Sequence, residues 1–185
     1  NNSVYLKNAE LRIAFNKASK ISAGIVEVPW RGFEEGIWKQ RFAVKILDDM
    51  EGLFTGSDRG VRLSGQIPYL TYDAMISNGE GTGGDSTAGN ETTSYNGGGR
   101  LKDYSAKFAV SPFESLGDSL KGFKVNALFH KGSKNESTLR NRIFAGLSYE
   151  SKYVNAVCNY FNADNGSGAG PSRGEGFSIY SVVTP

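Results

Sequence analysis

Apolar residues recur at every second position along most of this chain, and this spacing limits the possible folds more than any other feature. In the stretch 122–131 one parity holds Phe123, Val125, Ala127 and Phe129. Side chains of a β-strand point alternately to its two faces, so the spacing predicts strands with one apolar face. It predicts an all-β antiparallel fold of about nine strands, at 10–16, 21–28, 61–67, 70–77, 101–111, 122–131, 140–150, 153–162 and 176–183.

Helices have little support in this sequence. Glycine is abundant, with 24 residues, and aromatic residues make up 12% of the chain, a composition typical of strands and turns. The best helical stretch is short, at 33–39, inside a connection between strands. A membrane-spanning helix needs roughly 18–20 consecutive apolar residues, and the sequence contains no such run.

The predicted connections alternate between short and long. Short ones fall at 17–20, 66–69, 112–121 and 151–152, and longer ones at 29–57, 78–99, 131–139 and 162–175. A transmembrane β-barrel has this arrangement, with tight turns on one side and long loops on the other. Segment 78–99 is nearly all Gly, Ser, Thr, Asn and acidic residues, so we expect a mobile external loop there.

Two architectures compete for these strands. In a soluble β-sandwich the apolar parity packs against a second sheet, whereas in a membrane barrel it faces lipid and the polar parity faces water. Aromatic residues near predicted strand ends favour the barrel, because such barrels carry aromatic girdles. So do charged residues in mid-strand, which we predict to line a pore: Arg12, Arg62, Asp73, Lys107, Lys124 and Arg142.

One observation separates the two architectures. The barrel predicts that the apolar parity points out of a single curved sheet, and the sandwich predicts that it meets a second sheet. The residues that decide between them are Leu63, Ala74, Ala106, Val125, Leu147 and Ala156.

Residues that could carry catalysis are sparse. The only histidine, His130, would have to serve any Ser-His-Asp site, but no nucleophile signature accompanies it. We therefore interpret His130 as a solvent-facing strand residue and the single cysteine, Cys158, as a small residue on the apolar parity. We predict no enzyme, metal or cofactor, and the net charge of +2 does not favour a nucleic-acid partner.

Several short stretches form a pattern through their order and spacing: Ile25–Trp30 with Glu34-Glu35 and Trp38–Arg41, then Asp58–Gly65, Tyr72–Gly81, Leu120–Phe123 and Gly176–Ser178. Together they resemble the outer-membrane porins of Gram-negative bacteria, of the general and phosphate-selective types. The resemblance covers most of the chain, and the order and spacing of the motifs support it better than any single motif.

The resemblance implies a 16-stranded barrel in the outer membrane, usually trimeric, with one long loop folded into the pore. About nine strands are too few for that barrel, so we expect residues 1–185 to be part of one. By position the constriction loop is 29–57, although a solvated surface loop is the alternative. Its charged residues near the start are Arg31, Glu34, Glu35, Lys39 and Arg41.

The implied function is passive diffusion of small hydrophilic solutes or ions, with lipid and solute as partners. On the polar parity five basic residues (Arg12, Arg62, Lys107, Lys124 and Arg142) outnumber three acidic ones (Glu10, Asp73 and Glu150), with Glu27 left unassigned, which predicts a mild preference for anions. Two other functions stay open. One is a soluble or surface-exposed β-sandwich that binds carbohydrate or protein, and the other is a non-porin outer-membrane barrel acting as an anchor or enzyme.

Overall fold

The computed structural model describes residues 8–16, 18–39, 45–46, 53–54, 56–79, 102–117, 120–135, 138–164 and 173–183. They form one nine-stranded antiparallel sheet in which every strand pairs with its neighbours in sequence. The strands are β1 (Ala9–Asn16), β2 (Ser19–Glu27), β3 (Ser57–Ile67), β4 (Leu70–Ser77), β5 (Asp103–Val110), β6 (Phe123–Asn135), β7 (Thr138–Glu150), β8 (Val154–Asp164) and β9 (Arg173–Val183). The described helix, α1 (Pro29–Trp38), lies in the connection from β2 to β3.

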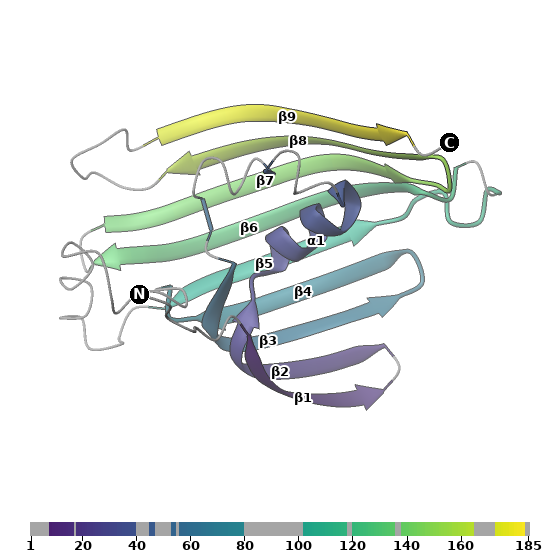
Figure 1. Ribbon diagram of the computed structural model, residues 1–185. Coiled ribbons are helices and arrows are strands. Elements are labelled where there is room, and N and C mark those ends of the chain that lie inside the picture. The colour runs from purple at the N-terminus through teal and green to yellow at the C-terminus, as the bar shows by residue number, and fades with distance from the viewer. Residues whose placement is uncertain are drawn as a thin grey trace, which may run out of the picture.

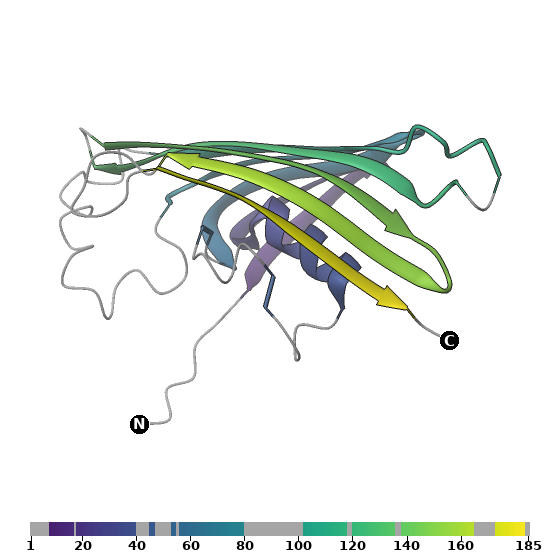
Figure 2. The same ribbon diagram turned by 90° about the horizontal axis from the view of Figure 1, so that it is seen from above.

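The sheet is curved like a trough, and α1 lies on its concave side (Figures 1 and 2). Strands β1 and β9 are the two edges, so the described strands form an open sheet rather than a closed barrel. The prediction of an all-β, up-and-down antiparallel fold is confirmed. Closure into a barrel stays a prediction.

The apolar parity lies on the convex face and is exposed. Leu63, Val125 and Leu147 are 38%, 48% and 55% exposed. Ala74, Ala106 and Ala156 share this parity on β4, β5 and β8, and every described strand belongs to the same sheet. Within the described ranges, then, no second sheet covers the apolar face, which contradicts the arrangement that the sandwich required.

The polar parity lies on the concave face, where many of its side chains are buried. Register places Ser64 opposite Asp73, Asp73 opposite Lys107 and Lys107 opposite Leu128. Asp73, Lys107 and Leu128 are all buried. The concave face is therefore a mixed surface of charges and apolar side chains, partly covered by α1.

Helix α1 begins four residues before the predicted stretch 33–39. Pro29 occupies its first turn, where the fixed φ of proline suits a helix and the missing N–H is not needed. The helix ends at Trp38, and the capping residue Lys39 adopts a left-handed conformation with φ 55° and donates its N–H to the Glu35 carbonyl at 3.0 Å. Among the described residues, no helix is long and apolar enough to cross a membrane.

One predicted loop length is wrong. Residues 131–139 were expected to form a long connection, but β6 runs to Asn135 and β7 starts at Thr138. Their paired ends lie beyond the apolar stretch, where Gly132 and Ser133 break the alternation. The connection predicted at 112–121 runs from Ser111 to Gly122, close to the predicted bounds. Most of the predicted external loop 78–99 lies outside the described residues, which stop at Gly79.

Candidate functional site

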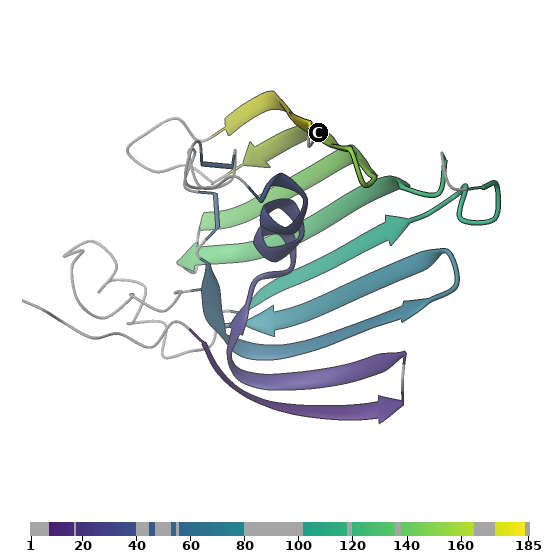
Figure 3. The same cartoon turned by 45° about the vertical axis from the view of Figure 1, so that its right-hand side comes forward.

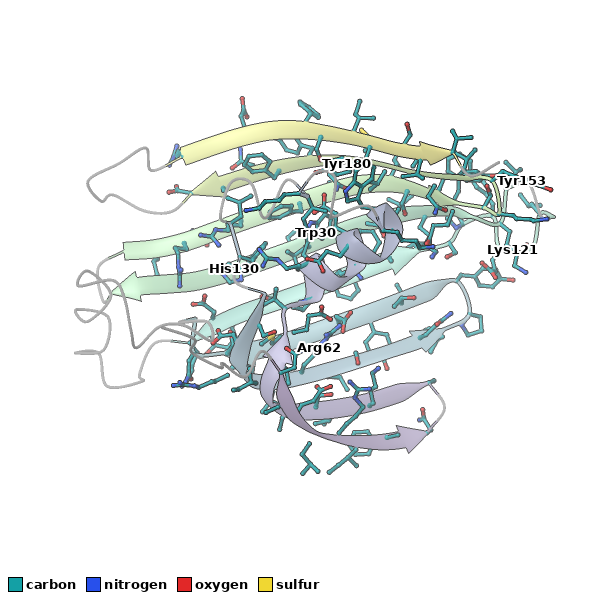
Figure 4. All side chains as sticks on the ribbon, viewed as in Figure 1. Trp30, Arg62, Lys121, His130, Tyr153 and Tyr180 are labelled. Atoms are coloured by element: carbon teal, nitrogen blue, oxygen red, sulfur yellow. The ribbon has the colours of Figure 1, made fainter. Side chains whose placement is uncertain are left out.

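The site is the concave face together with α1. Aromatic rings attach the helix to the sheet: Trp30 lies 4.9 Å from Phe144, and Trp38 lies 5.2 Å from Tyr180, between ring centroids. Figure 4 shows Trp30 and Tyr180 on the side of the sheet that carries the helix. Burying aromatic rings against one another stabilises the contact beyond the area removed from water.

A buried carboxylate adds a polar contact beneath the helix. Glu34 is fully buried, and its two oxygens accept hydrogen bonds from Trp30 Nε1 at 3.0 Å and from Asn159 Nδ2 at 2.8 Å. A buried carboxylate is costly unless it is hydrogen-bonded, so these donors make the burial of Glu34 tolerable. The bond from Asn159 joins α1 to β8, whereas the bond from Trp30 lies within the helix.

Coverage of the concave face by α1 is uneven. The helix contacts chiefly β8, with fewer contacts to β4, β5 and β9. Figures 1 and 3 show no described helix over β1 and β2. The helix therefore leaves uncovered the side of the concave face that β1 and β2 form.

Three charged residues form a chain at the boundary between the covered and uncovered areas. Arg62 Nε donates to Asp73 Oδ1 at 2.7 Å, and Lys107 Nζ lies 3.9 Å from Asp73 Oδ2. The Lys107 ammonium also lies 4.3 Å from the ring centroid of Phe33 on α1. Arg62 Nη1 also lies 4.0 Å from Glu27 Oε2, so the two cations are matched by two carboxylates.

A second charged group lies near the other ends of β5 and β6. His130 Nε2 lies 3.3 Å from Asp103 Oδ2, and Arg140 Nη2 donates to the same oxygen at 3.1 Å. The hydroxyl of Ser105 lies 2.9 Å from His130 Nδ1. The interpretation of His130 as solvent-facing is wrong: it is 8% exposed, and the Phe54 ring lies 5.1 Å from its own.

This group contains serine, histidine and aspartate but does not match the usual catalytic order. In the usual triad the serine meets Nε2 and the aspartate meets Nδ1, whereas here Ser105 meets Nδ1 and Asp103 meets Nε2. The register alone places Ser105 opposite His130. We interpret the group as an ion cluster that joins β5, β6 and β7.

The six predicted pore-lining residues all lie on the concave parity. Arg142 is stacked 5.2 Å from the Phe54 ring centroid, and Arg31 donates to the Phe54 carbonyl at 2.7 Å. Lys124 pairs with Glu150 at 2.7 Å, and Arg12 pairs with Glu10. The structure thus brings one predicted constriction residue, Arg31, and one predicted wall residue, Arg142, to the same residue, Phe54.

The predicted constriction residues have different environments. Arg31 and Glu34 are buried on the sheet side of α1, whereas Glu35 is half-buried and Lys39 is exposed at the end of the helix. Arg41 lies outside the described residues. Asp103 and Arg140 were not among the predicted site residues, and only the strand register brings them to this surface.

Gly146 gives a local test of how tightly the concave face is packed. A Cβ there would overlap Asn159 Oδ1 and lie 2.9 Å from the Cys158 carbonyl oxygen. Gly146→Ala should therefore lower the free energy of unfolding by about 1–3 kcal/mol. The matched control is Gly36→Ala in α1, where nothing lies within 4 Å; it should stabilise by up to about 1 kcal/mol, measured by urea unfolding. Equal effects at the two positions would contradict the packing described for Asn159.

Comparison of the chain with protein-family models, with curated proteins and with solved structures finds no match. The porin resemblance accordingly stays a prediction carried by the residues themselves. In the part of the chain that is described, no group of three or more His, Cys, Asp or Glu side chains could hold a metal ion.

Proposed function

We propose that this chain forms part of the wall of a water-filled pore in the outer membrane of a Gram-negative bacterium. The observation that supports this function best is the polarity of the sheet. A single curved sheet exposes apolar side chains on its convex face and gathers charges on its concave face. That polarity suits a wall between lipid and water.

The convex face supports contact with lipid. Soluble monomeric proteins rarely expose contiguous apolar patches larger than a few hundred Å². Here large apolar side chains are exposed on seven of the nine described strands, from Ile13 on β1 to Ile179 on β9. Burying this surface in a bilayer removes it from water, which is the main source of stability for such a sheet.

We call the band of exposed apolar side chains on the convex face the apolar belt. Aromatic and basic residues at its ends support a membrane orientation. Phe113, Phe123 and Tyr149 form contacts at one end, with ring centroids 6.3 and 4.8 Å apart. Lys121 and Tyr153 lie at that end in Figure 4. β6 runs from Phe123 to Asn135, and a strand of about ten residues, or about 33 Å, is long enough when tilted to cross an apolar band about 25 Å tall.

The concave face supports passage of small hydrophilic solutes or ions. Helix α1 narrows the trough by covering the side formed by β5–β9, in the position proposed for a constriction. Selectivity would come from the charges beside it, since pore charges set which ions pass. Because basic residues line this face, we expect a mild preference for anions; the residues are Arg62, Lys107 and Arg142. Completion of the barrel by further strands and assembly into a trimer belong to the same proposal.

Conductance across planar bilayers tests the proposed function. The complete barrel, purified and added to one side, should produce stepwise current increases, because each inserted pore conducts ions independently. In a potassium chloride gradient the reversal potential should have the sign of a chloride preference. Stepwise conductance with a clear cation preference would overturn the selectivity, and membrane insertion without conductance would overturn the pore.

A further inference from the structure

We propose that the concave face holds a solute subsite for a small carboxylate that also carries hydroxyl groups, such as a sugar acid. The subsite is a hollow of about 520 Å³ at the turn ends of β1–β4. This inference rests on the proposed function, since it names the class of solute that the pore would take. The side chains that define it are Asn16, Lys20, Arg62, Ser64, Gln66, Thr71 and Asp73.

The hollow lies on the part of the concave face that α1 leaves uncovered. Its lining comes from β1 through β4 and from the turn at Ala18, whereas α1 contacts mainly β8. Figure 3 shows β1 and β2 clear of the helix. A solute that passes beside the constriction would therefore meet this hollow.

Several polar side chains in the hollow are available to bind a solute. Among the described residues, Lys20, Gln66 and Thr71 make no side-chain hydrogen bond or ion pair, although all three line it. Amides and hydroxyls both donate and accept hydrogen bonds, as the hydroxyl groups of a solute require. A site specific for a halide or a bare carboxylate would not need hydrogen-bond acceptors.

The charges of the hollow favour an anion. Arg62 and Lys20 are its two cations, and Asp73 is its one carboxylate. Asp73 is already held by Arg62 at 2.7 Å and faces Lys107 at 3.9 Å. Its charge is therefore compensated within the wall, which leaves Lys20 to attract the carboxylate of a solute through a charge-assisted hydrogen bond.

The size of the hollow sets the size of the solute. Binding pockets for small molecules have volumes of about 300–1,000 Å³, and this hollow of about 520 Å³ lies within that range. A six-carbon sugar acid can place its carboxylate at Lys20 and its hydroxyls against Gln66 and Thr71. An aliphatic acid of equal length would leave those polar groups without partners, which costs affinity.

Calorimetric titration of the full chain in detergent micelles tests the subsite with three probes. Gluconate carries both charge and hydroxyls, hexanoate carries only the charge, and sorbitol carries only the hydroxyls. Gluconate should bind at least about tenfold more tightly than either of the others, since each lacks one of the two contacts. Equal affinity for gluconate and hexanoate would overturn the hydroxyl contacts, and equal affinity for gluconate and sorbitol would overturn the anion contact.

Variants place the binding in the hollow. Lys20→Gln should weaken gluconate binding about tenfold, and Gln66→Ala should weaken it while leaving hexanoate unchanged. Both side chains are exposed, so neither substitution disturbs the fold. Lys121→Gln, in the turn before β6, is the matched control and should bind gluconate like the parent. Unchanged binding in Lys20→Gln would overturn the subsite.

Failure of the subsite and failure of the pore give different results. Stepwise conductance without any preference for gluconate overturns the subsite and leaves the pore standing. Gluconate binding that depends on Lys20, without conductance, overturns the pore and leaves the binding site standing.

Discussion

Replacing Trp30 with alanine is expected to detach α1 from the concave face and to produce the largest loss of stability among the substitutions considered. Trp30 is 1% exposed, its ring lies 4.9 Å from that of Phe144, and its indole N–H donates to the buried Glu34. Truncating a buried tryptophan leaves a cavity and typically costs about 3–5 kcal/mol. Truncating Trp30 also removes one hydrogen-bond donor from a buried carboxylate. The loss of unfolding free energy should therefore lie at the upper end of this range.

Trp38→Ala is the matched control for this experiment. Trp38 contacts Tyr180 at 5.2 Å but is only partly buried, so its truncation should cost clearly less. The chain has two tryptophans, and each variant keeps one of them as a fluorescent reporter of urea unfolding. If α1 is the constriction, Trp30→Ala should also raise the single-channel conductance. Equal losses of stability in the two variants would contradict the role of Trp30 as the main anchor.

Ala145→Arg is expected to cost about 2–4 kcal/mol of folding free energy in bilayers, the cost of arginine on the lipid face near the bilayer midplane. Ala145 is exposed on the convex face, where it lies opposite Ala127 and Tyr160 near the middle of the apolar belt. On a surface exposed to water the same change should fall within about 0.5 kcal/mol. Urea titration of the protein folded into phospholipid vesicles measures the difference.

Ala156→Arg serves as the depth control for that substitution. Ala156 belongs to the same face but lies near the start of β8. There it is opposite Tyr149, one of the aromatic residues at the end of the apolar belt. Near the membrane interface the cost of arginine falls to about 0–1 kcal/mol. Equal, small costs at the two alanines would contradict a lipid-facing belt.

Much of the sheet could be predicted from the sequence because period-two alternation is a local property. The alternation of Phe123, Val125 and Ala127 with polar residues fixed both the strand and its apolar face. The ends of β6 and β7 were missed because Gly132 and Ser133 carry no such alternation. The start of α1 was missed because Pro29 and Trp30 read equally well as the end of the preceding strand.

The side-chain clusters could be predicted only in part, because they depend on register between strands. Parity placed Arg62, Asp73 and Lys107 on one face, and the structure brings them into contact. His130 was misjudged because its partners, Asp103 and Ser105, lie on the neighbouring strand. Spacing along one strand says nothing about which residue of the next strand lies opposite.

The single cysteine tests directly whether the convex face contacts lipid. Cys158 is exposed on that face, opposite Leu147 and Ile179. A nitroxide attached to Cys158 in the protein reconstituted into vesicles reports collisions with dissolved oxygen, which concentrates in lipid, and with a water-soluble nickel chelate. Contact with lipid predicts frequent collisions with oxygen and few with nickel, whereas the opposite ratio would show that this face meets water.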